Sequence, residues 1–210
     1  MSKLFFIQTT EVIKFLNLSS QKKYFNKMIS KRISNSIKAR QSIYPNKFNG
    51  KLIDEKLVLE LIDNANFAPS HKMTQPWFFK IFSENSKIRL LKEIFKIHKI
   101  SEIKKNKLRE NFKKSSHIIC ICMKKNSHLL PEWEEIAATA MAVQNIWISC
   151  VGSKIGGYWS TPKFIENLNT FLLLNDDERC LGLFYLGSLD FKNEKNFIGK
   201  KLHKKVEWFR

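Results

Sequence analysis

The chain of 210 residues has little glycine, proline or cysteine, with 7, 5 and 4 residues of each type. It contains no Gly/Ser-rich or Pro-rich linker and no internal repeat, so one domain with an extension is expected. No apolar run approaches the roughly 20 residues that span a bilayer, and the opening MSKLFFI is too short an apolar run for a secretory signal. We therefore expect a cytoplasmic protein with no membrane partner.

The four cysteines are too few for a disulfide framework in a chain of this length. Cys120 and Cys122 lie in the strand-like run HIICICM and share one face of it, where they could approach a metal ion. No CxxC or HxxxH spacing supplies further ligands. We expect these cysteines to pack as small apolar side chains and expect no metal site.

Acidic residues are also scarce, with 19 Asp and Glu against 37 Lys and Arg, which gives a net charge of +18. A basic nucleic-acid-associated domain is therefore one alternative. However, 31 of these cations are Lys and only 6 are Arg, the residue favoured in bidentate contacts with bases and phosphates. The Lys excess accompanies many Asn, Ile and Phe, whose codons are A/T-rich, so genome composition is a sufficient cause. We expect no specific nucleic-acid partner, and we interpret the dense patch Lys104–Lys114 as the solvated face of a helix.

The common catalytic motifs are missing too. The sequence has no P-loop, no GxGxxG dinucleotide fingerprint and no GxSxG nucleophile elbow. His98, His117, His128 and His203 each stand alone, without a nucleophile or second ligand at a recognisable spacing. Nothing in the sequence supports hydrolysis by a Ser/His/Asp triad.

Apolar periodicity predicts an alternation of helices and strands, which indicates a single α/β layer architecture. Ile29, Ile33 and Ile37 mark a helix stripe, and Asp54 is the expected N-cap of the next helix. Further helices are expected over 84–99, from Pro131 to Gly152 and over 162–168. A shorter helix is expected at about 10–18, and the span 100–115 is expected to be either helix or loop. Strands are expected over 77–83, 117–123 and 180–189, and Gly156-Gly157 is expected to form a turn that leads into a short strand-like piece before Pro162.

Four groups of polar and glycine residues stand out between these elements. They are Arg40-Gln41-Ser42, the stretch NFAPSHKMTQPWFF from Asn66 to Phe79, GGYWSTP from Gly156 to Pro162, and Lys200-Lys201. Each has a structural explanation of its own, as a helix C-terminus, a turn, a hairpin bend or solvated charge. Together they suit a phosphorylated planar aromatic ligand, because cations and a hydroxyl can hold a phosphate and paired glycines let the backbone approach a ring.

From about Met28 to Trp208 the chain resembles the FMN-dependent nitroreductase family, in particular its short NAD(P)H nitroreductase branch. The resemblance is carried, in this order, by KARQSIYP, NFAPSHKMTQPWFFK, LPEWEEIAATAMAVQNIW, GGYWSTP and ERCLGLFYLGSLD. It implies an α+β three-layer sandwich with a central mixed, mostly antiparallel sheet flanked by helices, built as an intertwined homodimer with FMN at the interface. Residues 28–210 would form this domain, and residues 1–27 an N-terminal extension without an assigned role.

The resemblance also implies a set of cofactor-binding residues. Arg40, Gln41 and Ser42 match residues that hold the FMN phosphate and ribityl chain, and His71 matches a residue supplied by the partner subunit. Trp159, Ser160 and Thr161 match a segment beside the isoalloxazine ring, and Gly156 and Gly157 shape the approach to it. Lys200 or Lys201 fills the place of a C-terminal cation that binds the phosphate.

Two departures from the family pattern concern polarity near the flavin. Met73 stands where many members have an Asn that contacts the ring, and Gln41 replaces a second basic residue. Lys72 is a candidate for the cation that stabilises the charge at N1–C2=O of the reduced flavin.

The implied reaction is a ping-pong transfer of hydride from NAD(P)H, through FMN, to a nitroaromatic, a quinone or another small electrophile. No catalytic side chain is needed, because the flavin N5 accepts the hydride. The alternatives are a flavin-binding member with a different reaction or no turnover and, less favoured, the basic nucleic-acid-associated domain.

Overall fold

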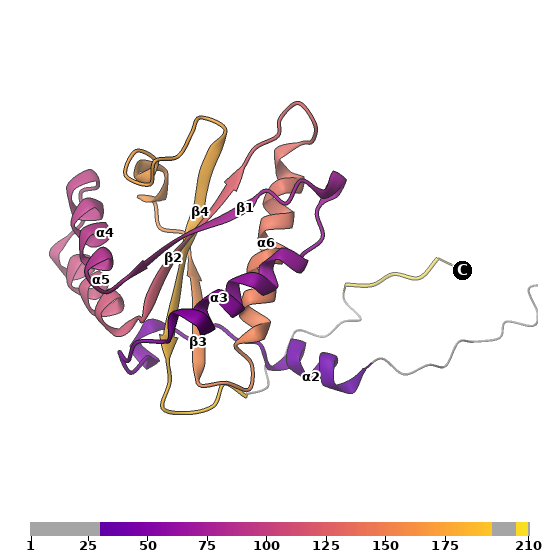
Figure 1. Cartoon of the computed structure of the whole chain (residues 1–210), viewed down its shortest axis with the longest axis horizontal. Helices are drawn as coiled ribbons and strands as arrows, with labels where there is room; N and C mark the ends of the chain where they lie inside the picture. Colours follow the sequence, from indigo (N-terminus) through magenta and orange to yellow (C-terminus); the bar gives the residue numbers. More distant parts are fainter. Residues whose placement is uncertain (1–29, 195–204, 210) are drawn as a thin grey trace, which may run out of the picture. The chain divides into compact units, whose positions relative to one another are not determined.

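A computed structural model describes residues 30–194 and 205–209 (Figure 1). The chain divides into a first unit, residues 1–32, and a second unit, residues 33–210. Of the first unit only residues 30–32 are described, and the architecture given below is that of the second. The expected extension 1–27, its short helix, and Lys200 and Lys201 lie outside the described residues.

The centre of the fold is a four-stranded sheet in the order β1-β2-β4-β3. Its strands are β1 (Trp77–Ser83), β2 (His117–Lys124), β3 (Ile155–Ser160) and β4 (Glu178–Ser188). All three pairings are antiparallel, so no parallel pair occurs among the described strands, where a mixed but mostly antiparallel sheet was expected. Every residue of β2 except the last is buried, which explains why its sequence is a continuous apolar run rather than an alternating one.

The helices follow the predicted order. They are α2 (Lys31–Ala39), α3 (Glu55–Asp63), α4 (Glu84–Ile97), α5 (Glu102–Lys114) and α6 (Glu132–Ser149). Asp54 is the N-cap of α3, as expected, and its Oδ1 accepts a hydrogen bond from the Lys56 backbone N–H at 2.8 Å. Helix α6 starts directly after Pro131 with three glutamates in its first turn, which favour a helix N-terminus. The uncertain span 100–115 forms α5.

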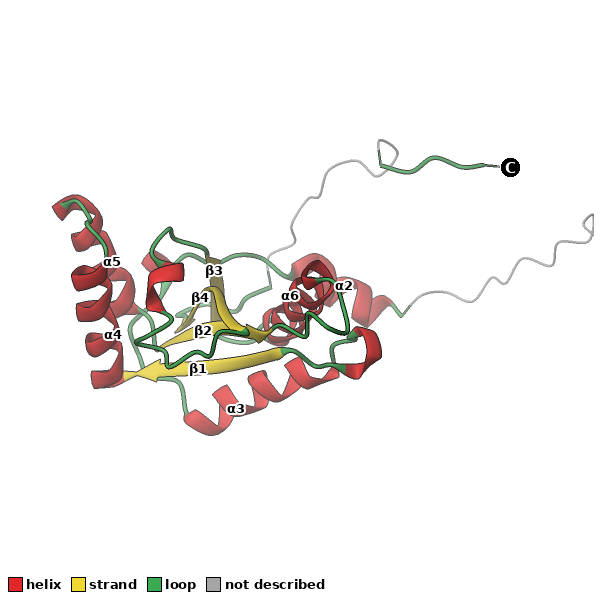
Figure 2. Ribbon diagram, turned by 90° about the horizontal axis from the view of Figure 1, so that it is seen from above, coloured by secondary structure: helices red, strands yellow, loops and turns green. Residues whose placement is uncertain are grey.

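Helices cover both faces of the sheet, which gives the expected three layers (Figures 1 and 2). On one side α3 and α6 pack against Ile119 and Ile121 of β2; we call this the α6 face. On the other side α4 and α5 pack against Ile118 and Cys120; we call this the α5 face. Successive residues of β2 therefore serve two separate hydrophobic cores.

Gly156 and Gly157 do not form the expected turn. They lie inside β3, where Gly156 pairs with Gly187 and Gly157 with Leu186. A Cβ atom on Gly157 would lie 2.3 Å from the ring of Phe184, so the glycine is needed for close packing rather than for chain reversal. The expected helix over 162–168 is a single 3₁₀ turn, Ile165–Leu168.

Among the described helices, none combines the length and the apolar character that crossing a bilayer requires.

Candidate functional site

A cavity of about 1230 Å³ opens on the α5 face of the sheet. The segment after α2, the end of β3, the α4–α5 connection and α5 itself surround it. Gln41, Ser42 and Ser160, three of the predicted site residues, line this cavity. Much of the remaining wall is aromatic, formed by Tyr44, Tyr158, Phe164 and Tyr185.

The Gly157 carbonyl oxygen accepts two hydrogen bonds, one of which joins two of the predicted segments. The Ile43 backbone N–H donates to the Gly157 carbonyl oxygen at 3.0 Å, and the indole Nε1 of Trp147 on α6 donates to the same oxygen at 3.0 Å. The Arg40 guanidinium lies over the Trp147 ring, 4.8 Å from its centroid. The segment Arg40–Ile43 is therefore held along the outer edge of β3, beside Gly156 and Gly157.

The alternation of β3 separates the other predicted residues. Gly156, Tyr158 and Ser160 point to the α5 face, whereas Gly157 and Trp159 point to the α6 face. Trp159 packs against the α6-face core, and its buried Nε1 has no hydrogen-bond partner. Thr161 is exposed and lines a second cavity, of about 650 Å³. Only part of the GGYWSTP segment therefore faces the main cavity.

His71 lies away from this cavity. It starts the 3₁₀ turn His71–Met73 just before β1, and β1 and β3 form opposite edges of the sheet. Its Nδ1 is 2.5 Å from Glu134 Oε2 at the start of α6, and both Lys72 and His71 are exposed. Lys72 Nζ donates to the Leu129 carbonyl oxygen at 3.4 Å, so in a single chain neither side chain reaches the cavity.

Much of the stretch from Asn66 to Trp77 serves to shape this loop. Gln75 donates to Ser70 Oγ from its backbone and to the Asn66 carbonyl from its side chain, at 3.1 and 3.5 Å. Trp77 Nε1 donates to Asn66 Oδ1 at 3.3 Å.

The same loop holds unfavourable backbone conformations. Lys72, Met73 and Gln75 have φ values of 51°, 54° and 42°. Such conformations cost on the order of 1–3 kcal/mol each and persist where surrounding contacts impose them. The loop is thus fixed in a shape that presents His71, Lys72 and Met73 to the outside.

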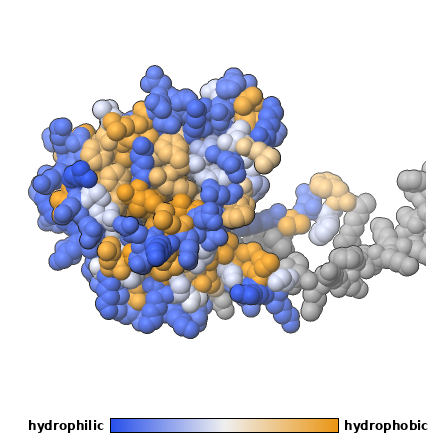
Figure 3. Space-filling model, in the orientation of Figure 1, coloured by the Kyte–Doolittle hydropathy of each residue, from blue (hydrophilic) through white to orange (hydrophobic). Residues whose placement is uncertain are grey.

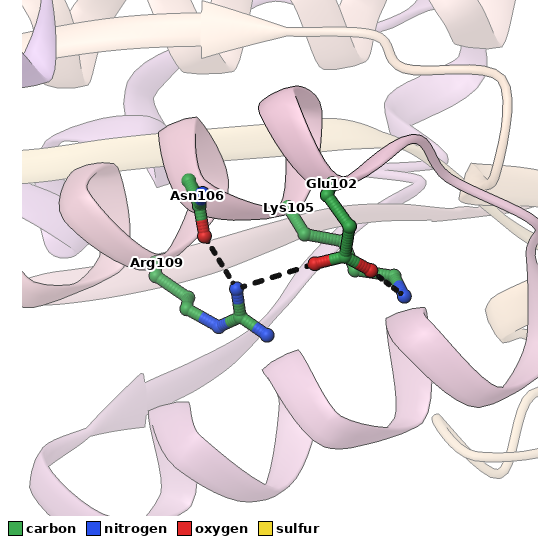
Figure 4. A network of polar contacts seen from close by, with 4 residues as sticks. All are labelled: Glu102, Lys105, Asn106 and Arg109. Carbon is green, nitrogen blue, oxygen red and sulfur yellow. Dashed lines mark hydrogen bonds and ion pairs between the residues drawn. The ribbon is translucent and has the colours of Figure 1, made fainter.

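The main cavity is strongly cationic. Lys99, Lys104, Lys107 and Lys163 line it, and none of them forms an ion pair with another described residue. The nearby carboxylate of Glu102 is already paired, with Lys105 at 2.6 Å and Arg109 at 3.9 Å, and Arg109 also donates to Asn106 Oδ1 at 2.6 Å (Figure 4). Unpaired ammonium groups around an aromatic wall favour a ring-containing anion.

Several of these residues escaped the sequence analysis. Tyr44 and Tyr158 pack against each other with ring centroids 4.5 Å apart and planes tilted by 39°, and they lie inside KARQSIYP and GGYWSTP, whose polar residues were the predicted ones. Lys104 and Lys107 were assigned to a solvated helix face. Their exposure agrees with that interpretation, but the cavity beside them is formed by segments distant in sequence.

Burial raises the pKa of Tyr185, so this phenol lines the cavity in its neutral form. Within residues 30–194 and 205–209, no group of three or more His, Cys, Asp or Glu side chains is arranged to hold a metal ion.

Comparisons with known proteins agree with this architecture. The chain is 25% identical over 163 residues to the Bacillus subtilis (strain 168) protein named "Putative NAD(P)H nitroreductase YfhC", covering 73% of this chain and 82% of that one. The structure of a nitroreductase-like family protein from Bacillus cereus superposes with a TM-score of 0.74 at 22% identity, covering 89% and 99% of the two chains. The FMN-dependent nitroreductase NfnB from Mycobacterium smegmatis, solved with NADPH, gives 0.68 at 13% identity, covering 86% and 99%.

The model of the nitroreductase family matches residues 37–188. The matched region contains α3 to α6, all four strands and the wall of the main cavity from Gln41 to Tyr185. Because the match spans most of the sequence, the chain belongs to the nitroreductase family.

Proposed function

We propose that the chain is an FMN-dependent oxidoreductase that uses NAD(P)H to reduce a nitroaromatic, a quinone or another small electrophile. The observation that carries this proposal is the main cavity, where Gln41 and Ser42 meet Ser160 across an aromatic wall with unpaired lysines around it. The Mycobacterium smegmatis relative, which is FMN-dependent and was solved with NADPH, supports the choice of cofactor and donor.

The residues present fit such a cofactor. Tyr44 and Tyr158 offer flat apolar surface for an aromatic ring system, and the hydroxyls of Ser42 and Ser160 can bond to a polar chain or a phosphate. A cavity of about 1230 Å³ exceeds the roughly 300–1000 Å³ of typical small-molecule sites. It therefore has room for a flavin and for a second ring-containing ligand beside it.

When bound, FMN supplies the redox chemistry, taking a hydride from NAD(P)H and passing reducing equivalents to the acceptor in a ping-pong cycle. The chain binds and orients both ligands. In this proposal Gln41, Ser42 and Ser160 hold the cofactor directly, while Arg40, Gly156 and Gly157 fix the edge of β3 that borders it. Lys104 and Lys107 attract the phosphates of the incoming nicotinamide nucleotide.

In this proposal the remaining predicted site residues act from outside the main cavity of a single chain. Lys200 or Lys201 would bind the cofactor phosphate, and His71 would reach the flavin of a second subunit. Trp159 and Thr161 would support the ring-binding segment from the α6 face and the cavity margin.

We further propose that the working unit is a homodimer with FMN at the interface. Large apolar side chains are exposed on α3, on α6 and in the loops before β1, including Leu59, Phe67, Met73 and Trp133. Figure 3 shows apolar residues gathered in the middle of the face seen in Figure 1, with hydrophilic residues around them. A second copy is a suitable cover, because monomeric proteins rarely expose large contiguous apolar patches. Light scattering during size-exclusion chromatography should give twice the mass of the chain, and a stable monomer that retains FMN would contradict the dimer.

The decisive experiment is purification of the full chain with added FMN, followed by absorbance spectroscopy and an NAD(P)H oxidation assay. We expect a yellow protein with flavin absorbance that consumes NAD(P)H with menadione or nitrofurazone as acceptor. Tight FMN binding without turnover would favour the flavin-binding alternative. A colourless protein that binds DNA in a strongly salt-dependent way would overturn the proposal in favour of the nucleic-acid alternative.

A further inference from the structure

Three of the four cysteines form a cluster on the α5 face of the sheet. Cys120 and Cys122 are two residues apart on β2 and share a face, and Cys122 lies directly opposite Cys180 of β4. All three are buried and free, with Cys180 alone retaining a small exposure of 6%. The earlier expectation that the pair on β2 would pack as apolar side chains did not include Cys180, because 57 residues separate it from Cys122 along the chain.

The sulfur atoms of the cluster interact with one another. The Cys180 thiol donates to the Gly182 carbonyl oxygen at 3.4 Å, and the Cys122 thiol donates to the Cys120 carbonyl oxygen at 3.8 Å. Contact with the thiols of Cys120 and Cys122 lowers the pKa of Cys180, and the same contact together with burial raises the pKa of Cys120 and of Cys122. Cys180 is therefore the member of the cluster that loses its proton most readily.

A cation lies on the same face of the sheet, next to the two cysteines of β2. Lys80 of β1 lies opposite Cys120, so its side chain is on the same face as the cluster. Its ammonium lies near the Phe78 ring and makes no ion pair with any carboxylate of the described residues. Its positive charge offsets a small part of the increase in the pKa of Cys120 and of Cys122. An unpaired lysine near a thiol is a setting in which cysteines become reactive.

Cys180 is also the member of the cluster that a small reagent can reach. It lines the second cavity, of about 650 Å³, together with Lys163 and Arg179. The bulge at Leu181, where the pairing shifts between Ile121 and Cys122, interrupts the ladder beside Cys180. Directly opposite residues of antiparallel strands have Cα atoms about 4.5–5.5 Å apart, within the range that a disulfide requires.

We propose that Cys122 and Cys180 form a reversible redox site that closes to a disulfide on reaction with a peroxide. Cys180 loses its proton and attacks one peroxide oxygen, the O–O bond breaks, and the leaving hydroxide takes up a proton to become water, so that Cys180 becomes a sulfenic acid. The Cys122 thiol then attacks the Cys180 sulfur, the S–O bond breaks, and the oxygen leaves as water with the Cys122 proton. Overall two thiols are oxidised and one peroxide is reduced to two waters, and a dithiol reductant restores both thiols. This inference is independent of the proposed function and needs no flavin.

The test uses the full chain treated with hydrogen peroxide, then denatured, alkylated and digested with trypsin. Trypsin separates the cysteines into three peptides. Cys120 and Cys122 fall in the peptide 115–124, Cys180 in 180–192 and Cys150 in 126–154. We expect the number of alkylated cysteines to fall from four to two, with a disulfide joining Cys122 to Cys180 and complete recovery after dithiothreitol.

Cys150 is the built-in control. It lies at the end of α6, its Sγ donates to Ile146 O at 3.4 Å, and burial raises its pKa to about 12. We expect Cys150 to stay alkylatable and Cys150→Ser to oxidise like the parent chain, whereas Cys122→Ser and Cys180→Ser lose the link. Lys80→Gln should keep the link but form it several-fold more slowly, and it keeps the proposal testable if a cysteine variant fails to fold.

Three results would overturn this inference. One is a protein whose four thiols all stay reduced under conditions that oxidise glutathione in the same tube. The others are oxidation of Cys150 at the rate of Cys180 and a disulfide that involves Cys120 instead of Cys122, since either excludes a specific pair.

Discussion

The two faces of the sheet are built from the same strands, yet they differ in how completely they are covered. We call the α6 face the closed face and the α5 face, which carries the main cavity, the open face. On the α6 face, Phe184 and Leu186 of β4 pack against Ala138, Ala142 and further small and branched side chains of α6 in one buried core. On the α5 face, α4 and α5 cover one part of the sheet and leave the main cavity beside another. Stability and ligand binding are thus assigned to opposite sides of β3 and β4, and substitutions one residue apart should have different consequences.

The largest expected effect is on the closed face, from Gly157→Val. A Cβ at this position would lie 2.3 Å from the Phe184 ring, and the ring has no free space because Trp147 packs edge-on against it. Overpacking of this kind costs typically 1–3 kcal/mol, and we expect a loss of about 3 kcal/mol in the free energy of unfolding, measured by urea denaturation.

Tyr158→Phe is the matched control, because it changes the next residue, which points to the open face. It should alter the stability by no more than about 0.5 kcal/mol. Equal urea midpoints for Gly157→Val and the parent chain would contradict the assignment of Gly157 to the closed face.

The double variant Lys104→Gln/Lys107→Gln, on the open face, should have a smaller effect. It should weaken nucleotide binding and leave stability unchanged. Both lysines line the main cavity and have no ion-pair partner among the described residues, so their removal should leave the urea midpoint unchanged. Under the proposed function, KM for NADPH should rise about tenfold, equivalent to about 1.4 kcal/mol, with little change in kcat.

Lys113→Gln is the matched control, since Lys113 is an exposed residue of the same helix that does not line the cavity. An equal increase of KM in both variants would show that general charge, rather than the cavity, attracts the nucleotide. Titration of the oxidised nucleotide by calorimetry gives a second readout that does not depend on turnover.

The sequence was most informative where local patterns decide the structure. The apolar run of β2, the N-cap Asp54 and the glutamates after Pro131 each act through neighbours within a few residues, and the elements they predict are present. The glycines of β3 were wrongly predicted to form a turn, because the residues that require glycine at these positions are distant in sequence. Phe184 and Phe48 occupy the space that side chains at these positions would need.

The candidate site was likewise predicted where local sequence patterns decide it and missed where distant segments form it. Gln41, Ser42 and Ser160 were predicted through the family resemblance, and the cavity does bring them together. A short strand-like piece was expected after the glycines, but β3 begins before them, at Ile155, and its alternation turns Trp159 away from Ser160. The lysines of α5 could not be assigned to a cavity from sequence, since its opposite wall is formed by residues 41–47.

The smallest expected effect concerns a titratable group on the closed face, His117 at the start of β2. Its ring is buried and within 2.8 Å of Ser116 Oγ, with Lys87, Glu55 and Glu84 nearby. Burial lowers the pKa of His117, and the charge of Lys87 lowers it further, while the two glutamates act in the opposite direction. The folded state therefore prefers the neutral ring.

The sign of the pH dependence follows from this preference. Above the unfolded-state pKa of about 6.5 the ring is neutral in both states, so the full stability is present. As the pH falls below that value, the unfolded chain binds a proton that the folded chain does not, and stability is lost until the folded pKa is reached. The loss is limited to about 1.4 kcal/mol for each unit by which the pKa is lowered.

The measurement is the free energy of unfolding in urea at several pH values from 7.5 to 5, for the parent chain and for His117→Gln. The glutamine retains a polar group next to Ser116 but does not titrate, so the stability difference between the two proteins should shift in favour of the variant as the pH falls. His128→Gln, at an exposed position, should instead follow the parent chain throughout. Parallel curves for His117→Gln and the parent would mean that water reaches the ring in the folded state, and the closed face would then be less tightly packed around β2 than its contacts indicate.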